Sequence, residues 1–136
     1  MKQRKAIVSR RMRAIRTSGT APELAVRHLV RKMGIRYRTN VNTLPGKPDL
    51  ANQRQGWAIM VNGCMWHGHS CAKHRQPKVN VAFWREKIRS NQQRDVRNRA
   101  QLRKSGIAVL TVWQCELRRP EVAERKLKVF LRNRCE

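Results

Sequence analysis

Two short apolar runs flank one long helical segment, and this arrangement constrains the fold more than any other feature of the sequence. Trp57–Asn62 and Ile107–Trp113 have the length and apolar character of strands buried inside a sheet. Between them, Ala82–Ser105 contains no glycine or proline and is followed by Gly106, which predicts a long helix. A strand–helix–strand unit crosses over in the right-handed sense, so the two strands are expected to be parallel neighbours.

A helix is expected ahead of the strands. Thr20–Glu23 predicts a capping box at its start, with Pro22 in the first turn. Gly34 is expected to end the helix. Its inward face is predicted to carry an apolar stripe of Leu24, Leu29, Val30 and Met33.

Two shorter strands and a final helix complete the expected α/β fold. Ile35–Thr39 and Asp49–Gln53 are predicted strands, and Pro120 is expected to open a helix that runs to Arg132. The order is then αβββαβα, a mixed central sheet flanked by helices. A chain of 136 residues suits one hydrophobic core. We expect residues 1–19 to form a basic arm and residues 20–136 a single domain.

The charge of the chain is strongly one-sided. Lys and Arg number 32 and Asp and Glu number 8, which gives a formal net charge of +24. Such a surface repels itself unless a polyanion is present, so the charge favours a nucleic-acid partner over a merely supercharged surface. An acidic membrane is disfavoured, since the sequence has no long apolar run and no lipidation signal. Residues 1–16 hold seven cations and no acid, typical of an arm that follows phosphates or of a solvated tail.

Three cysteines and a histidine predict a metal centre. Cys64, His69 and Cys71 lie in one loop with the spacing C-x4-H-x-C. Cys115 comes just after the strand expected beside Trp57–Asn62, so it should lie near the start of that loop. Three thiolates and an imidazole are the ligands of a closed, structural zinc site. The alternative is three buried thiols beside an unrelated histidine.

The chain has only two aspartates, and the position of each suggests a function. Asp49 follows the rigid Pro45–Pro48 turn at the start of a predicted strand. Asp95 lies seven residues after Ile88 and eleven after Trp84, so the three share one face of the long helix. An inward carboxylate needs a cation, an imidazolium or a metal with its waters as partner. A buried ion pair is the alternative role for Asp95.

His67 and two tryptophans stand close to these groups in the sequence. His67 shares the loop of the metal ligands but is not one of the four. Beside a carboxylate and a hard metal, a histidine can take a proton from water, although a lone histidine can equally be a surface residue. Trp66 and Trp84 are either core anchors or a wedge pushed between DNA bases.

These motifs together resemble a known family. They occur in order along almost the whole chain and are similar to the very short patch repair (Vsr) mismatch endonucleases, whose fold is that of the type II restriction endonucleases. The segments that carry the resemblance are Pro45–Asp49, Gly63–Cys71, Phe83–Ile88, Arg94-Asp95 and Val112–Glu116.

The resemblance implies a role for individual residues. Asp49 and the backbone carbonyl of Val61 would bind a catalytic magnesium ion, and His67 would be the general base. Glu23 and Asp95 would position metal-bound waters or the histidine. The other matches are the zinc ligands Cys64, His69, Cys71 and Cys115, and the DNA-intercalating positions Met65, Trp66 and Trp84.

Three positions depart from the family pattern. Met65 stands where relatives usually have Phe, which would weaken stacking on bases without removing the wedge. Asn62 stands where some relatives have His, which would alter the positioning of water. Val61 would act through its backbone, so its side chain should matter little.

We therefore expect a zinc-stabilised, magnesium-dependent DNA endonuclease. It would nick one strand of duplex DNA on the 5′ side of the thymine in a T:G mismatch and so start very short patch repair. It would act as a monomer on nucleoid DNA in the bacterial cytoplasm, with mismatch-repair proteins as partners.

Two other functions remain open at this point. One is a restriction-type endonuclease of the same fold that cuts unmodified sites. The other is a non-catalytic zinc protein that only binds DNA. The joint presence of Asp49, His67 and Asp95 argues against the latter, because binding alone needs no carboxylates facing phosphates.

Overall fold

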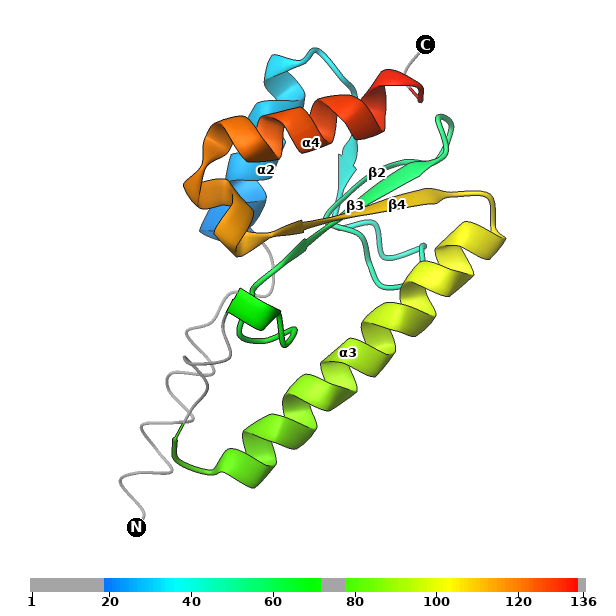
Figure 1. Ribbon diagram of the computed structural model, residues 1–136. Coiled ribbons are helices and arrows are strands. Elements are labelled where there is room, and N and C mark those ends of the chain that lie inside the picture. Colours follow the sequence, from blue (N-terminus) through cyan, green and yellow to red (C-terminus); the bar gives the residue numbers. More distant parts are fainter. Residues whose placement is uncertain (1–18, 72–77, 135–136) are drawn as a thin grey trace.

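The computed structural model describes residues 19–71 and 78–134, so the predicted basic arm lies outside the described residues except for Gly19. A central sheet separates two helices on one side from one long helix on the other (Figure 1). The elements follow the predicted order: α2 (Ala21–Lys32), β1 (Arg38–Thr39), β2 (Leu50–Asn52), β3 (Trp57–Asn62), α3 (Val81–Lys104), β4 (Ala108–Trp113), η2 (Gln114–Arg118) and α4 (Pro120–Arg132).

The sheet is mixed, with strand order β1-β2-β3-β4. β1 and β2, and then β2 and β3, pair antiparallel, whereas β3 and β4 pair parallel from Trp57↔Ala108 to Asn62↔Trp113. The predicted parallel pair is thereby confirmed. Because the carboxyl ends of β3 and β4 lie side by side, the loop after β3 and the 3-10 helix η2 after β4 begin at the same edge.

The core lies on both faces of the sheet. Successive strand residues point to opposite faces, so Trp57 and Ile59 pack under α2 and α4, and Ala58 and Met60 lie on the side of α3. The first cluster is completed by Val26, Val30, Leu50, Val112, Leu127 and Leu131, and the second by Ala51, Leu102 and Ile107. Ile88 and Leu102 are the buried residues of α3. The rest of this long helix is therefore free to line a site or to contact a partner.

The structure corrects the predicted start of α2. Thr20 Oγ1 accepts a hydrogen bond from the Glu23 amide at 3.4 Å, as expected. The Glu23 carboxylate, however, accepts from the Gly19 amide at 2.7 Å instead of from Thr20, so the box is shifted by one residue. Leu24 is half-exposed, and Val26 takes its predicted place in the core because it lies one turn before Val30 on the same face.

Two predicted strands also differ from the observed ones. β1 is shorter than Ile35–Thr39, since only Arg38 and Thr39 pair with β2. β4 lies mostly half-buried, with Val112 its one fully buried residue. In the described part of the chain, no helix combines the length and the apolar character needed to cross a membrane.

Candidate functional site

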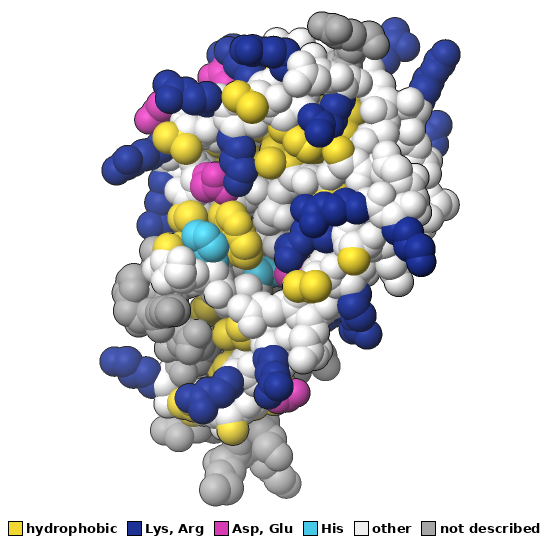
Figure 2. All heavy atoms as spheres, turned by 45° about the vertical axis from the view of Figure 1, so that its right-hand side comes forward, with side chains coloured by type: hydrophobic (Ala, Val, Ile, Leu, Met, Phe, Trp, Pro, Cys, Tyr) yellow, Lys and Arg dark blue, Asp and Glu magenta, His cyan; other side chains and the backbone are white. Residues whose placement is uncertain are grey.

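A cleft of about 630 Å³ opens at the carboxyl ends of β3 and β4. Its walls come from the start of α2, the loop before β2, the loop after β3 and the inner face of α3. Figure 2 shows histidine side chains in a hollow of a surface on which Lys and Arg side chains are widely spread. The lining residues that bear on the chemistry are Glu23, Lys47, Asp49, Val61, Asn62, Trp66, His67, Lys87, Asp95 and Arg99.

Two carboxylates lie together in the wall of this cleft. Burial raises the pKa of Asp49 from 3.8 to about 7, and the neighbouring charge of Glu23 acts in the same direction. The hydrogen bond from the Val61 amide, 2.6 Å from Asp49 Oδ2, and the positive charge of Arg27 oppose this rise. Glu23 is only 4% exposed, and its Oε2 lies 3.4 Å from Arg27 Nη2. A buried pair of this kind favours either a shared proton or a bound cation.

The oxygen atoms of this pair fit a hard divalent cation. Magnesium is held in proteins through one or two carboxylates together with waters and substrate phosphates. The amide of Val61 points at Asp49. Because the N–H and C=O of one strand residue face the same neighbouring strand, the Val61 carbonyl faces the same edge. Glu23, Asp49 and Val61 could therefore hold magnesium together.

His67 and Asp95 form the second polar pair of the cleft. His67 Nδ1 lies 2.5 Å from Asp95 Oδ2, and the side chains are 26% and 22% exposed. When the carboxylate accepts the Nδ1 proton, Nε2 keeps its lone pair and can act as a base. Helical spacing predicted that Asp95 points inward, and the structure shows that its partner there is the imidazole of His67.

Two further side chains of α3 hold the loop that carries His67. Asn91 Nδ2 donates to the Trp66 carbonyl at 2.8 Å, and Gln92 Nε2 donates to the Gly68 carbonyl at 3.3 Å. Gly68 has φ +65°, and a Cβ there would lie 2.3 Å from Gln92 Nε2. Glycine is therefore required where the loop passes α3.

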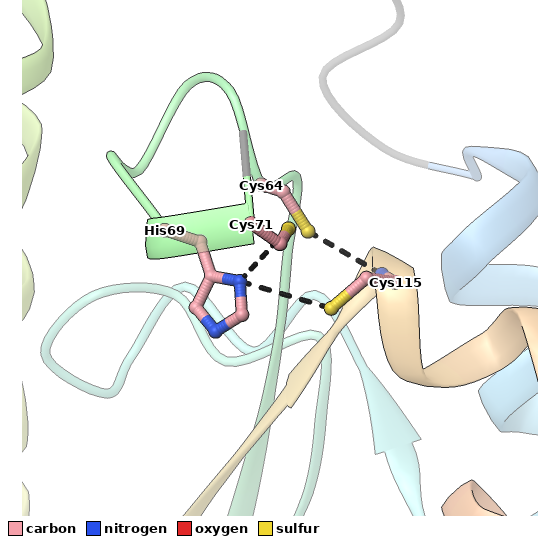
Figure 3. A group of neighbouring side chains, drawn as sticks. All are labelled: Cys64, His69, Cys71 and Cys115. Carbon is pink, nitrogen blue, oxygen red and sulfur yellow. Dashed lines mark hydrogen bonds between the residues drawn. The ribbon is translucent and has the colours of Figure 1, made fainter. Parts of the chain in front are cut away.

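Three thiols and one imidazole form a separate cluster beside the cleft (Figure 3). The possible ligand atoms of Cys64, His69, Cys71 and Cys115 all lie within 4.8 Å of one another. His69 Nδ1 lies 3.1 Å from Cys71 Sγ and 3.7 Å from Cys115 Sγ, and the Cys115 amide donates to Cys64 Sγ at 3.3 Å. The four residues that the sequence predicted as one metal cluster thus converge around one point.

Close packing in this cluster shifts the pKa values of two thiols in opposite directions. Burial and the neighbouring Cys64 and Cys71 raise the pKa of Cys115 to about 12. The hydrogen bond with His69 lowers the pKa of Cys71 to about 7. Several soft donors converging at this distance fit one soft or borderline cation, with no protein position left open for substrate.

The aromatic residues form a short row next to the cleft. The ring centroids of Trp66 and Trp84 are 5.0 Å apart with planes at 60°, and Phe83 lies 5.2 Å from Trp84. Phe83, for which the sequence pattern predicted no role, is 53% exposed. Met65 is half-buried next to Trp66. Trp66 lines the cleft, and Trp84 reaches it through Trp66.

Some lining residues were not predicted although a signal for them exists. Lys87 and Asn98 line the cleft, and Asn91 holds its loop; all three recur at intervals of three or four residues with Asp95 on α3, so helical periodicity places them on its inner face. Arg27 lies four residues after Glu23, the spacing of a helical ion pair.

The mixed sheet, the carboxylate and histidine pairs in one cleft, and the basic charge define a restriction-endonuclease-like DNA endonuclease.

Residues 2–73 match the family model described as DNA mismatch endonuclease Vsr. The chain is 40% identical over 114 residues to the DNA mismatch endonuclease Vsr of Escherichia coli, covering 84% of this chain and 73% of the relative. It is 39% identical over 121 residues to a type II nicking enzyme of Neisseria meningitidis, covering 89% and 86%. A type II nicking enzyme of Xanthomonas oryzae is 39% identical over 120 residues, covering 88% of each chain. The chain belongs to the Vsr family of DNA mismatch endonucleases.

Proposed function

We propose that this endonuclease nicks one strand of duplex DNA on the 5′ side of the thymine in a T:G mismatch, with magnesium as the catalytic ion. The observation that carries the proposal is the meeting of two polar pairs, Glu23–Asp49 and His67–Asp95, in one cleft of a chain with net charge +24. The relatives, a mismatch endonuclease and nicking enzymes by name, support the same substrate and the same single-strand outcome.

The protein groups divide the work of phosphodiester hydrolysis. Asp95 holds Nδ1 of His67, which leaves Nε2 to take the proton of the attacking water. Asp49 and the Val61 carbonyl would hold magnesium, with Glu23 orienting its waters, and the ion would supply charge stabilisation for the phosphate and the leaving group. Lys87 and Arg99 line the same cleft and would hold the phosphates. The products would be a 3′-hydroxyl and a 5′-phosphate.

We assign zinc to the Cys64, His69, Cys71 and Cys115 cluster, with a structural role. Its ligands come from the loop after β3 and from η2 after β4, so the ion would tie two irregular segments to one edge of the sheet. Metal affinity of this kind contributes directly to the folding free energy. The loop that carries His67 would then depend on zinc for its order.

Mismatch selection would come from the cost of opening the base stack. Met65, Trp66 and Trp84 would act as a wedge, and a mismatched step resists unstacking less than a matched one. The packing of Trp66 against Trp84, with Trp66 also lining the cleft, supports a coupling between insertion and catalysis.

The remaining assignments concern the organisation of the chain. We propose that residues 1–19 form an arm that follows DNA phosphates and that residues 20–136 form one nuclease domain. We also propose that the enzyme acts as a monomer before mismatch-repair proteins continue the process.

A panel of duplexes tests the proposed function. Matched and T:G duplexes of the same sequences are incubated with the zinc-loaded protein, with and without magnesium. We expect a nick only in the thymine strand of T:G duplexes and only with magnesium. Cleavage of matched duplexes at equal rates would favour the restriction-type alternative, and binding without cleavage would favour the non-catalytic one.

A further inference from the structure

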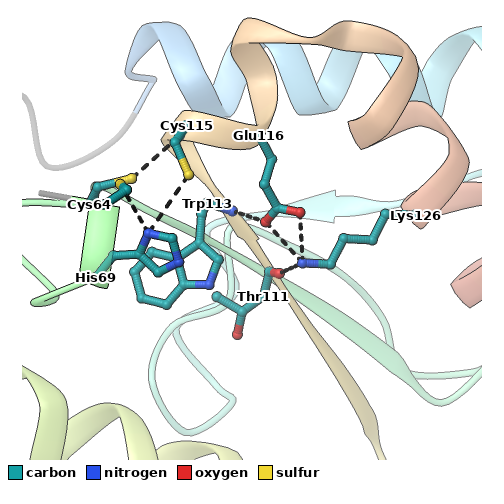
Figure 4. Close-up of polar contacts among 8 residues, drawn as sticks. Cys64, His69, Thr111, Trp113, Cys115, Glu116 and Lys126 are labelled. Carbon is teal, nitrogen blue, oxygen red and sulfur yellow. Dashed lines mark hydrogen bonds and ion pairs between the residues drawn. The ribbon is translucent and has the colours of Figure 1, made fainter.

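Trp113 pairs with two histidine rings of the site, His67 and His69, and Figure 4 shows its indole beside the imidazole of His69. Its indole is stacked on the imidazole of His69, with centroids 4.3 Å apart and planes at 24°. It also meets the ring of His67 in an edge-to-face pair, with centroids 6.4 Å apart and planes at 74°. His69 belongs to the metal cluster and His67 to the cleft, so one side chain is paired with both.

The backbone of Trp113 is firmly anchored. Trp113 is the last residue of β4 and pairs with Asn62 of β3. Its amide donates to Glu116 Oε1 at 2.9 Å. Lys126 of α4 binds both oxygens of Glu116, at 2.9 and 3.1 Å, and donates to the Thr111 carbonyl at 2.7 Å. The indole is therefore placed by the sheet and by α4.

The histidines, in contrast, lie on a segment of turns after β3. On one side of His67, the carboxylate of Asp95 holds Nδ1. The indole of Trp113 lies next to the same ring and to His69. A catalytic group has to be held close to its productive geometry by neighbours that are themselves fixed.

We propose that Trp113 is a positioning residue that couples the metal cluster to the cleft. Its stacked face holds His69 in the orientation that suits the metal, and its contact with His67 keeps that ring against Asp95. This inference rests on the proposed role of His67 as the base. Trp113 is neither among the residues that line the cleft nor among the four converging ligand groups, so it would act through the two histidines.

Two substitutions separate the two contacts. Trp113→Phe keeps one aromatic ring for His69 but is too short to reach both histidines, whereas Trp113→Leu offers no aromatic face. Zinc affinity is measured by chelator competition without DNA, and kcat and KM by nicking of a T:G duplex. We expect Trp113→Phe to keep its zinc affinity within about twofold and to lose about tenfold or more in kcat, with KM unchanged. Trp113→Leu should lose about tenfold in both zinc affinity and kcat.

Trp57→Phe is the matched control. Trp57 is fully buried in the core between the sheet and the helices α2 and α4, so this variant should melt at a lower temperature yet keep the kcat and zinc affinity of the wild type. The inference would be overturned if Trp113→Phe kept the wild-type kcat. It would also be overturned if the variant lost activity only through a higher KM. Failure of both Trp113 variants to fold would also overturn it, since Trp113 would then be a packing residue.

His67→Ala shows which of the two proposals fails. If His67→Ala nicks at the wild-type rate, the proposed catalytic base is wrong. If His67→Ala is inactive while Trp113→Phe is fully active, the positioning role of Trp113 alone is wrong.

Discussion

Asp95 on α3 and His67 in the loop after β3 are 28 positions apart in the chain, yet Asp95 Oδ2 lies 2.5 Å from His67 Nδ1. The contact fixes the ring through one nitrogen and leaves the other for chemistry. It also ties the long helix, which carries Trp84 in its first turn, to the cleft.

This contact predicts a graded loss of activity. Asp95→Asn still offers an oxygen to the Nδ1 proton but cannot stabilise a protonated ring. General-base catalysis contributes about a hundredfold to ten-thousandfold, so we expect His67→Ala to lose that range and Asp95→Asn to lose less. The measurement is single-turnover nicking of a T:G duplex. Equal losses in the two variants, or a larger loss for Asp95→Asn, would contradict the assignment of His67 as the base.

The carboxylate pair predicts a pH-dependent stability without magnesium. The pKa of Asp49 is raised from 3.8 to about 7, so between these values the native state keeps a proton that the unfolded chain has lost. The free energy of unfolding should therefore fall as the pH rises from about 4 to about 7. Asp49→Asn removes this dependence and should be more stable at pH 8 by about 1–3 kcal/mol.

Denaturant unfolding in magnesium-free buffer that leaves zinc in place measures this effect. Adding magnesium should stabilise the wild type and not Asp49→Asn, because a ligand that binds only the native state raises its stability. If the free energy of unfolding had the same pH dependence in the two proteins, the pKa of Asp49 would not be raised in the native state.

The metal cluster predicts which substitutions release metal. Cys115→Ala removes the donor that reaches the cluster from η2, so we expect it to lose zinc and to disorder the loop 63–71. His67→Ala should keep one zinc per chain, since His67 is not among the four converging groups. Elemental analysis of the purified variants decides the matter. Zinc lost from His67→Ala and retained by Cys115→Ala would mean that the two roles are exchanged.

The wedge predicts a loss confined to mismatched DNA. Base–aromatic stacking contributes about 1–3 kcal/mol, so Trp66→Ala should lower nicking at T:G about tenfold to a hundredfold. Salt-dependent affinity for matched DNA should stay unchanged, because Lys and Arg supply it. Met65→Phe should increase nicking. The readout is 2-aminopurine fluorescence beside the mismatch, which rises when the stack opens.

Val96→Ala is the control for this experiment, as Val96 is a 58% exposed apolar residue on the same helix as Trp84. It should behave as the wild type. Equal brightening with wild type, Trp66→Ala and Trp84→Ala would mean that the tryptophans only pack against each other.

The sequence predicted the features that depend on regular patterns. The parallel neighbours β3 and β4 follow from a strand–helix–strand unit, and their shared edge placed Cys115 near the ligands of the next loop. Helical spacing likewise placed Asp95 on the inner face of α3.

Contacts that depend on the path of irregular segments were not predicted. Nothing in the pattern shows that Trp113 stacks on His69, because this depends on how the loop after β3 folds back across β4. Leu24 was misplaced because a helix with apolar residues on several faces does not specify which face meets the sheet. Only the packed structure resolves such choices.

The central claim is that the cleft holding Asp49 is the active site, and Asp49→Asn tests it most directly. Nicking of a T:G duplex is measured at saturating DNA and magnesium, with binding followed separately. We expect DNA binding to be retained or tightened, because a negative charge near phosphates is removed, and nicking to fall by at least about a thousandfold. Substantial nicking by Asp49→Asn under these conditions would contradict the account.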